Sequence, residues 1–252
     1  MTVNPGWPVA IAIGLLLVVT VVMYAVGSLP KPGSTLFAAA RAIVQLSLAA
    51  LIITAVIGSL ALSVMLLLVM FSIAVVTTVR RIEARASWPW ATVAMLAGLL
   101  PVLAIILLTR TVPTSGISLI PIVGILAGNT MNGHTLVGRR AFAALREEKG
   151  QYEAALSLGF TRAQAITEVI HRRVPEALIP GLDQVRTAGV VTLPGAFIGV
   201  LLGGGSPAQA AAAQILVLIG IMAAQTTTAV VAERLIAQAR LLPPDLRDSL
   251  HG

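Results

Sequence analysis

The sequence predicts an all-α polytopic membrane protein of about seven transmembrane helices, with a helical loop on the cytoplasmic side. Of its 252 residues, 57% are hydrophobic and only 11% are charged, whereas about 25% of the residues in a soluble domain are charged. Long apolar runs alternate with short polar or basic segments along the whole chain. Lipid is therefore the predicted solvent, and residues 1–252 are expected to form a single transmembrane domain.

The charge pattern fits a membrane protein better than a nucleic-acid-binding one. The net charge is +7, yet the basic residues lie in short clusters between apolar runs and follow no single face. Membrane lipid is thus the expected surrounding, and no nucleic-acid partner is expected. The chain has no cysteine and only three scattered histidines. This excludes disulfides and thiolate metal sites, and it leaves the ligands of any metal unknown.

Seven apolar runs approach the length of about 20 residues that a helix needs to cross the hydrocarbon core. The first run has no basic start and no cleavage box before Lys31, so we expect a retained helix rather than a signal peptide. The second run is the weakest because it contains Arg41 and Gln45, although an Arg near a helix end can reach the interface. The predicted spans are residues 7–26, 36–57, 60–79, 88–109, 117–137, 178–202 and 208–232.

The distribution of Lys and Arg among the short loops predicts the orientation. If seven helices alternate, the basic clusters of the loops and the tail fall on one side, and only Arg110 falls on the other. We therefore expect an outside N-terminus and a cytoplasmic C-terminus in the plasma (inner) membrane. A polar loop of about 139–176 and a tail of about 233–252 would then face the cytoplasm, where a water-soluble partner can dock.

The cytoplasmic loop is predicted to form two short helices around a break at Gly159. Glycine suits the left-handed conformation that ends many helices. Thr161 and Gln164 have the spacing of a capping box at the start of the second helix. Composition alone allows an ordinary amphipathic connector as readily as a docking element. The apolar face of the second helix consists of Ile166, Val169, Ile170 and Val174.

The first of these two helices resembles the EAA loop of ABC permeases, whose short cytoplasmic helix seats in a cleft of the ATPase subunit. The resemblance rests on Glu153-Ala154-Ala155 followed by Gly159, and it implies that these four residues couple the chain to an ATPase. The alanines would permit close approach, Glu153 would meet a basic or amide donor, and Gly159 would set the bend. At 169–172 the chain departs from that loop, because Val-Ile-His-Arg stands in place of Ile-x-Leu-Pro.

Three further stretches narrow the resemblance: Gly-Asn-Thr-Met-Asn at 128–132, Gly-Val-Val-Thr-Leu-Pro-Gly at 189–195 and Gly-Gly-Gly-Ser-Pro at 203–207. In this order they are similar to the FetB family of bacterial iron-export permeases and related plant aluminium-tolerance permeases, over about residues 41–214. The resemblance implies the permease subunit of an ABC transporter that exports a metal ion such as iron. Its implied partners are two copies of a separate ATPase subunit, which uses the ATP, and a second copy of the permease.

One departure from the FetB pattern bears on the substrate. Relatives have two methionines after Leu-Pro-Gly, where this chain has Ala196 and Phe197. A metal substrate of this chain would therefore be held without those methionines, by oxygen ligands rather than by softer ones.

Polar side chains inside the predicted spans are candidates for a substrate pathway, because unpaired polar groups are costly in lipid. Asn129 and Asn132 are one turn apart on one helix face, although hydrogen bonds between helices are the alternative role. The sixth span holds a second group, in which Asp183 and Arg186 can instead form a purely structural ion pair. The candidates of the sixth span are Asp183, Gln184 and Arg186.

Pro194 and Gly195 lie midway along the sixth span and predict a kink or break there. A break at this depth would serve as a hinge for alternating access or would expose a carbonyl to the pathway. An ordinary proline kink is the alternative.

Known catalytic motifs are missing from the chain. It has no Walker A sequence, no Gly-x-Ser-x-Gly and no His-Glu-x-x-His. We therefore expect no catalytic site and no cofactor bound by this chain. The alternatives are a membrane-embedded enzyme that uses the groups between Asn129 and His134 together with Asp183, and an ABC permease for a non-metal small molecule. A receptor or channel would need a ligand-binding lysine, a gate ring or an external domain, and none can be identified.

Overall fold

The computed structural model describes residues 6–28 and 32–250 of the chain. The chain divides into two compact units, Met1–Gly58 and Ser59–Gly252. Our expectation of one transmembrane domain over the whole length stays a prediction. Among the described residues, six helices are long and apolar enough to cross a membrane, one fewer than the seven spans expected.

The first unit consists of two apolar helices that contact each other, α1 (Trp7–Val26) and α2 (Pro32–Val56). Most large side chains of α1 are exposed, and none of its residues is buried. A helix that is apolar on all sides requires lipid or protein around it. Arg41 and Gln45 of α2 are likewise exposed. Contact with lipid alone would be unfavourable for these polar side chains.

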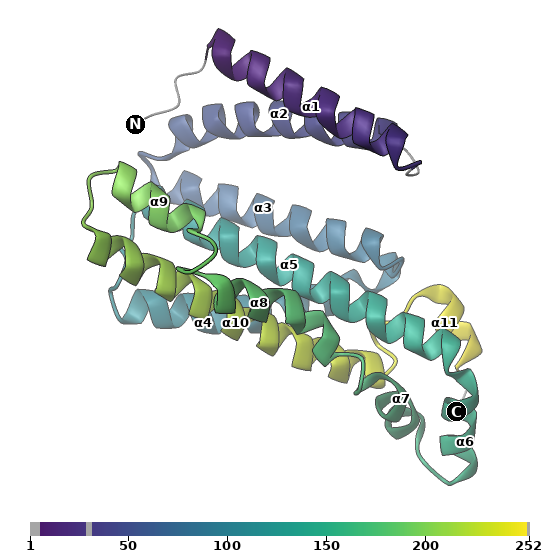
Figure 1. Cartoon of the computed structure of the whole chain (residues 1–252). Coiled ribbons are helices and arrows are strands. Elements are labelled where there is room, and N and C mark those ends of the chain that lie inside the picture. The colour runs from purple at the N-terminus through teal and green to yellow at the C-terminus, as the bar shows by residue number, and fades with distance from the viewer. Residues whose placement is uncertain (1–5, 29–31, 251–252) are drawn as a thin grey trace. The chain divides into compact units, whose positions relative to one another are not determined.

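Four long helices form the bundle of the second unit (Figure 1): α3 (Leu60–Arg81), α4 (Trp88–Leu108), α5 (Gly116–Glu147) and α10 (Pro207–Ala237). Helix α10 packs against both α4 and α5, and α5 packs against α3. The starts of α3 and α10 are capped by serines: Ser59 accepts a hydrogen bond from the backbone of Leu62, and Ser206 forms a capping box with Gln209.

The sixth expected span, 178–202, is not one helix. It consists of α8 (Ile179–Thr187) and α9 (Gly195–Leu202), separated by a short non-helical segment. The break begins at Ala188, which is extended, and continues through Gly189, which has a φ of +84° that favours glycine. Pro194 ends the break as the N-cap of α9. The predicted interruption at Pro194 and Gly195 is therefore present, and it starts six residues earlier than expected.

Helix α5 is longer than its predicted span and extends to Glu147, so the first residues of the expected loop continue the transmembrane helix. Two short helices follow, α6 (Lys149–Ser157) and α7 (Arg162–Ile170). Gly159 between them has a φ of +88°, and Thr161 and Gln164 form the capping box that their spacing predicted. The 3₁₀ turn η2 (Pro175–Leu178) leads from α7 into α8.

The α6–α7 hairpin and the C-terminal tail share one hydrophobic core with the ends of the long helices. Another 3₁₀ turn, η1 (Arg85–Ser87), joins α3 to α4, and the Ser87 hydroxyl donates to the carbonyl of Leu242 at 3.1 Å. After α10 the chain turns back and forms α11 (Pro244–Ser249), which contacts α5. The tail is thus docked rather than extended, and its buried side chains are Leu241, Leu242, Leu246 and Leu250.

Candidate functional site

The break between α8 and α9 places non-helical backbone beside the bundle. Its turn is held by local hydrogen bonds, from Gly189 N to Thr192 O at 2.8 Å and from Val191 N to Thr187 O at 2.9 Å. Val190 at its tip is 89% exposed. Irregular backbone at membrane depth is tolerated only where protein or water covers it. Interrupted helices of this kind surround the substrate sites of many transporters.

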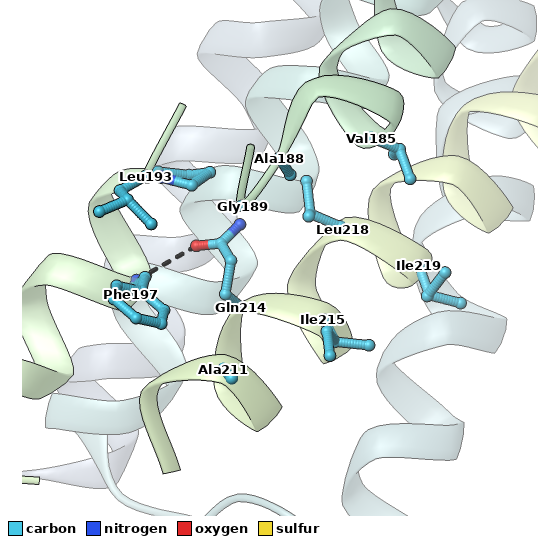
Figure 2. A pocket seen from close by; sticks show the side chains of 11 residues that line it. Val185, Ala188, Gly189, Leu193, Phe197, Ala211, Gln214, Ile215, Leu218 and Ile219 are labelled. Atoms are coloured by element: carbon cyan, nitrogen blue, oxygen red, sulfur yellow. Dashed lines mark hydrogen bonds between the residues drawn. The ribbon is translucent and has the colours of Figure 1, made fainter. Parts of the chain in front are cut away.

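A pocket of about 280 Å³ lies between this break, the start of α9 and the N-terminal half of α10. Figure 2 shows Gln214 of α10 in its middle, with the amide oxygen directed at the backbone of Phe197. That oxygen accepts a hydrogen bond from Phe197 N at 3.2 Å, one of the free N–H groups in the first turn of α9. Gln214 therefore fixes the second half of the broken helix to α10. The other walls are mostly apolar, including Val185, Leu193, Ile215, Leu218 and Ile219.

A second glutamine of α10, Gln225, connects three helices. Its amide nitrogen donates to the carbonyl oxygen of Asn129 at 3.0 Å, which links α10 to α5. Its amide oxygen lies against Gly181 of α8, so closely that a Cβ there would collide with it. Gln214 and Gln225 are about three turns apart and so share one face of α10. Gln225 was not among the residues predicted from the sequence, although an amide inside an apolar run is a signal for such a role.

The predicted pathway residues do not form one cluster. The side chain of Asn129 donates to the Ile125 carbonyl of its own helix at 2.9 Å, whereas Asn132 is exposed and accepts from Arg81 at 3.4 Å. Asp183 pairs with Arg186 at 3.4 Å. Of the two asparagines, Asn129 is the one joined to α8, through Gln225. The sixth-span candidates Asp183, Gln184 and Arg186 are exposed, and none of them lines the pocket.

One buried side chain without hydrogen-bond partners is a residue that we did not select as a pathway candidate, His134 of α5. Its side chain is fully buried, and neither ring nitrogen has a hydrogen-bond partner among the residues that the structure describes. A buried polar group without a partner calls for an explanation such as an ion or a water. In the sequence, His134 could have been identified as an ionisable residue inside an apolar run.

The hairpin presents a different set of residues from the one that the EAA resemblance implied. Glu153 and Ala154 are exposed, but Ala155 is buried against the chain's own core. The exposed apolar side chains of the bend are Leu158, at 79%, and Phe160. A shallow groove adjoins them on α7, and it is lined by Phe160, Ala163, Gln164, Thr167 and Glu168.

Ion pairs connect this hairpin to the bundle. Arg173, just after α7, donates to Glu148 at 2.7 Å and lies 3.5 Å from Glu176. Glu176 in turn lies 3.5 Å from Arg140 of α5. His171 at the end of α7 lies 2.7 Å from Glu233 of α10. Because the hairpin also shares the core, a displacement of α7 would be passed to both long helices.

No resident metal site is evident. Within 6–28 and 32–250, no group of three or more His, Cys, Asp or Glu side chains could hold a metal ion. The polar side chains of α10 that contact the broken helix are the amides of Gln214 and Gln225, which can both donate and accept hydrogen bonds.

The six apolar helices and the absence of any strand in the described part of the chain define an all-α, multi-pass membrane protein. The chain belongs to the uncharacterised protein family UPF0014, whose profile matches residues 7–240. The resemblance to the FetB family is confirmed, because the relatives of the chain include a FetB protein and two plant proteins.

Three relatives illustrate the similarity. UPF0014 membrane protein STAR2 of Oryza sativa subsp. japonica is 30% identical over 201 residues, which are 79% of this chain and 70% of the relative. Protein ALUMINUM SENSITIVE 3 of Arabidopsis thaliana is 32% identical over 136 residues, 54% of this chain and 50% of the relative. Probable iron export permease protein FetB of Escherichia coli (strain K12) is 32% identical over 130 residues, 52% of this chain and 50% of the relative. The last two alignments thus span half of each relative. No solved structure matches the chain.

Proposed function

We propose that this chain is the membrane-spanning permease subunit of an ABC transporter and that it exports a metal ion such as iron. The observation that carries the proposal is the similarity to the relative named as a probable iron export permease. The interrupted helix with its pocket supports a transport role, since such a break suits alternating access. The chain itself would be non-catalytic, and ATP would be used by a separate subunit.

The α6–α7 hairpin is the proposed docking site for that ATPase. It leaves the bundle at the end that carries most of the basic residues, which we assign to the cytoplasm. Because Ala155 faces the chain's own core, the contact would be made by the exposed side chains around the Gly159 bend, chiefly Leu158 and Phe160, with Glu153 and Ala154 beside them. Two permease copies and two ATPase copies would complete the transporter.

The proposed substrate path follows the broken helix. Asn129 borders it through the bond between its carbonyl and Gln225, and Pro194 with Gly195 would act as the hinge at which α9 moves relative to α8. Asn132, Asp183, Gln184 and Arg186 are exposed, so they would meet the ion at an entrance rather than in the interior.

A second candidate substrate is a non-metal small molecule. The pocket at the break favours it, because the walls are mostly apolar and Gln214 supplies the polar side chain. A partly apolar molecule with one hydrogen-bonding group would fit such a lining.

The proposed function is tested with the permease and its ATPase expressed together, using Leu158→Asp and Ser157→Asp. Ser157 is also exposed, but its hydroxyl bonds the Glu153 carbonyl of its own helix at 2.9 Å. Removing a buried Leu contact costs about 1.5–3 kcal/mol, so Leu158→Asp should weaken ATPase binding about tenfold or more. Ser157→Asp places the same charge one residue away and should bind as the wild type does.

The substrate is tested by the metal content of the same cells. Cells with the wild-type pair should hold less iron than cells with the Leu158→Asp pair at equal membrane levels. Equal ATPase binding by the wild type and Leu158→Asp would show that the hairpin is only a connector. Equal iron content in the two kinds of cell, although only the wild-type pair binds the ATPase, would exclude iron and favour the small-molecule alternative.

A further inference from the structure

Two buried polar side chains of the bundle lack hydrogen-bond partners in the described part of the chain, His134 of α5 and Thr228 of α10. Both are 0% exposed. The other buried threonines of these two helices and of α3 are satisfied: Thr130 donates to Leu126 O at 2.7 Å, and Thr78 lies 3.3 Å from Thr135. The unmet groups are therefore exceptions within a core that otherwise pairs its hydroxyls.

The register of α5 against α10 places His134 and Thr228 at the same height along the two helix axes. Leu126 of α5 lies beside Gly220 of α10, and Asn129 bonds Gln225, so the two helices run in parallel. The same step of eight residues leads from Leu126 to His134 and from Gly220 to Thr228. Equal steps on parallel helices keep two residues level, so His134 and Thr228 lie at the same height.

The side of α5 that carries His134 meets α4. Gly133 contacts Gln225 of α10, whereas Thr135 bonds Thr78 of α3. His134 is between them in sequence and, at 100° per residue, projects between the two contacts. Helix α4 packs against α3, α5 and α10 and fills that side.

Helix α4 packs closely against α10 at the height of Thr228. A Cβ at Gly98 would collide with the hydroxyl of Thr228 and with the carbonyl oxygen of Ala224. Such packing leaves little room for a partner beside the Thr228 hydroxyl. Sulfur donors lie at the neighbouring junction, because Met95 of α4 is fully buried in a small cluster against which Met131 of α5 packs.

We propose that His134, with Thr228 beside it, is a transient ligand site for a transition-metal cation, which reaches it when α4 separates from α5 and α10. Imidazole nitrogen is a common ligand of Fe, Zn, Cu and Ni ions, and a hydroxyl oxygen can complete the shell. In the closed bundle both groups are unpaired, and this cost is relieved when a cation or its water replaces the surface of α4. The inference rests on the proposed export of a metal ion and names the residues that would hold the ion inside the bundle.

The direct test is Co²⁺ binding to the full chain with its ATPase subunit in lipid nanodiscs, read from the absorption change when a nitrogen ligand enters the Co²⁺ shell. His134→Leu should weaken binding at least about tenfold, and Thr228→Val by a smaller factor. His171→Gln removes an exposed histidine and should leave binding unchanged. Co²⁺ binding by His134→Leu at wild-type affinity would overturn the proposal.

Thr130→Val is the matched control for Thr228→Val, because both hydroxyls are fully buried but only that of Thr130 is bonded. Thr228→Val and His134→Leu should raise the thermal midpoint by about 2–4 °C, since each removes an unmet polar group. Thr130→Val should lower the midpoint. A lower midpoint for Thr228→Val and His134→Leu as well would mean that both groups are already satisfied, which contradicts the proposal.

Metal content of cells separates this inference from the proposed function. We expect the wild-type transporter to lower cellular metal and the His134→Leu variant not to lower it. If both lower it equally, His134 is not a ligand although the export function stands. If neither does while Co²⁺ binding still depends on His134, the site stands and the proposed export fails.

Discussion

Single glycines and glutamines decide how closely the helices of this bundle approach one another. Gly98 allows α4 to lie directly on α10, and Gly181 allows α8 to lie on the amide of Gln225. Gln214 and Gln225 then make hydrogen bonds to backbone atoms of other helices. In lipid, where the hydrophobic effect between helices is absent, small residues and polar side chains of this kind hold helices together.

The contact at Gly98 makes a prediction about stability. Gly98→Ala should lower the thermal midpoint, because overpacking costs about 1–3 kcal/mol. Gly128→Ala is the matched control: Gly128 is also inside a transmembrane helix, but a Cβ there would meet nothing within 4 Å. The control should be neutral or stabilising, since Ala favours a helix by about 1 kcal/mol over Gly. Thermal unfolding in one detergent measures both, and equal effects would disprove the close α4–α10 contact.

Among the elements, the α6–α7 hairpin and the α8–α9 break are neighbours in sequence as well as in function. The hairpin leads through η2 directly into α8, which carries Gly181 against Gln225. The same hairpin is joined to α5 and α10 by ion pairs. A push on the hairpin would therefore reach the first half of the broken helix, α5, and α10, which borders the pocket.

The ion pairs of the hairpin predict a coupling defect. Arg173→Gln breaks the contacts to Glu148 and Glu176 and should reduce the number of ions moved per ATP hydrolysed by about twofold or more, since orientation is lost. Arg172→Gln is the control, because the ion pair of Arg172 is local, with Glu168 four residues earlier at 3.1 Å. Transport and ATP hydrolysis are measured together in proteoliposomes. An unchanged ratio of transport to ATP hydrolysis in Arg173→Gln would show that these ion pairs play no part in coupling.

The tail helix α11 predicts a dependence on pH. The hydrogen bond from Arg146 to Asp245, at 2.8 Å, lowers the pKa of Asp245 below its ordinary value of 3.8. Such a carboxylate stabilises docking above that value, and the contribution is lost as the pH falls below about 4. The protection factor of the α11 amides, which corrects for the pH dependence of intrinsic hydrogen exchange, should therefore decrease from pH 5 towards pH 3, to an extent that Asp245→Asn removes. Asp248→Asn in the same helix should keep the pH dependence.

At the scale of the whole molecule, the structure consists of two compact units, one with α1 and α2 and one with the bundle, hairpin and tail. Basic residues gather at one end of the bundle, at the hairpin and tail. Retention of such residues in the cytoplasm sets the orientation of membrane proteins. The hairpin and the docked tail are thus expected on the same cytoplasmic side.

This orientation is tested by cysteine labelling, since the chain has no native cysteine. Gly150→Cys, at an exposed position with nothing within 4 Å, should react with an impermeant reagent only after the cells are opened. Thr114→Cys, in the exposed turn before α5, should react in intact cells. Labelling of Gly150→Cys from outside would reverse the orientation and remove the hairpin from any cytoplasmic ATPase.

The sequence by itself determined the all-α membrane class, the approximate positions of the long helices, the bend at Gly159 and the capping box after it. These features depend on hydropathy over about 20 residues or on spacing within one turn, which are local properties. Only the tertiary structure decided that Ala155 faces the core, that the sixth span breaks at Ala188, and that Gln225 links Asn129 to α8. The lack of a hydrogen-bond partner for His134 was likewise decided by the tertiary structure. Each of these depends on which distant helix lies opposite a given side chain, and no local pattern in a uniformly apolar sequence records that choice.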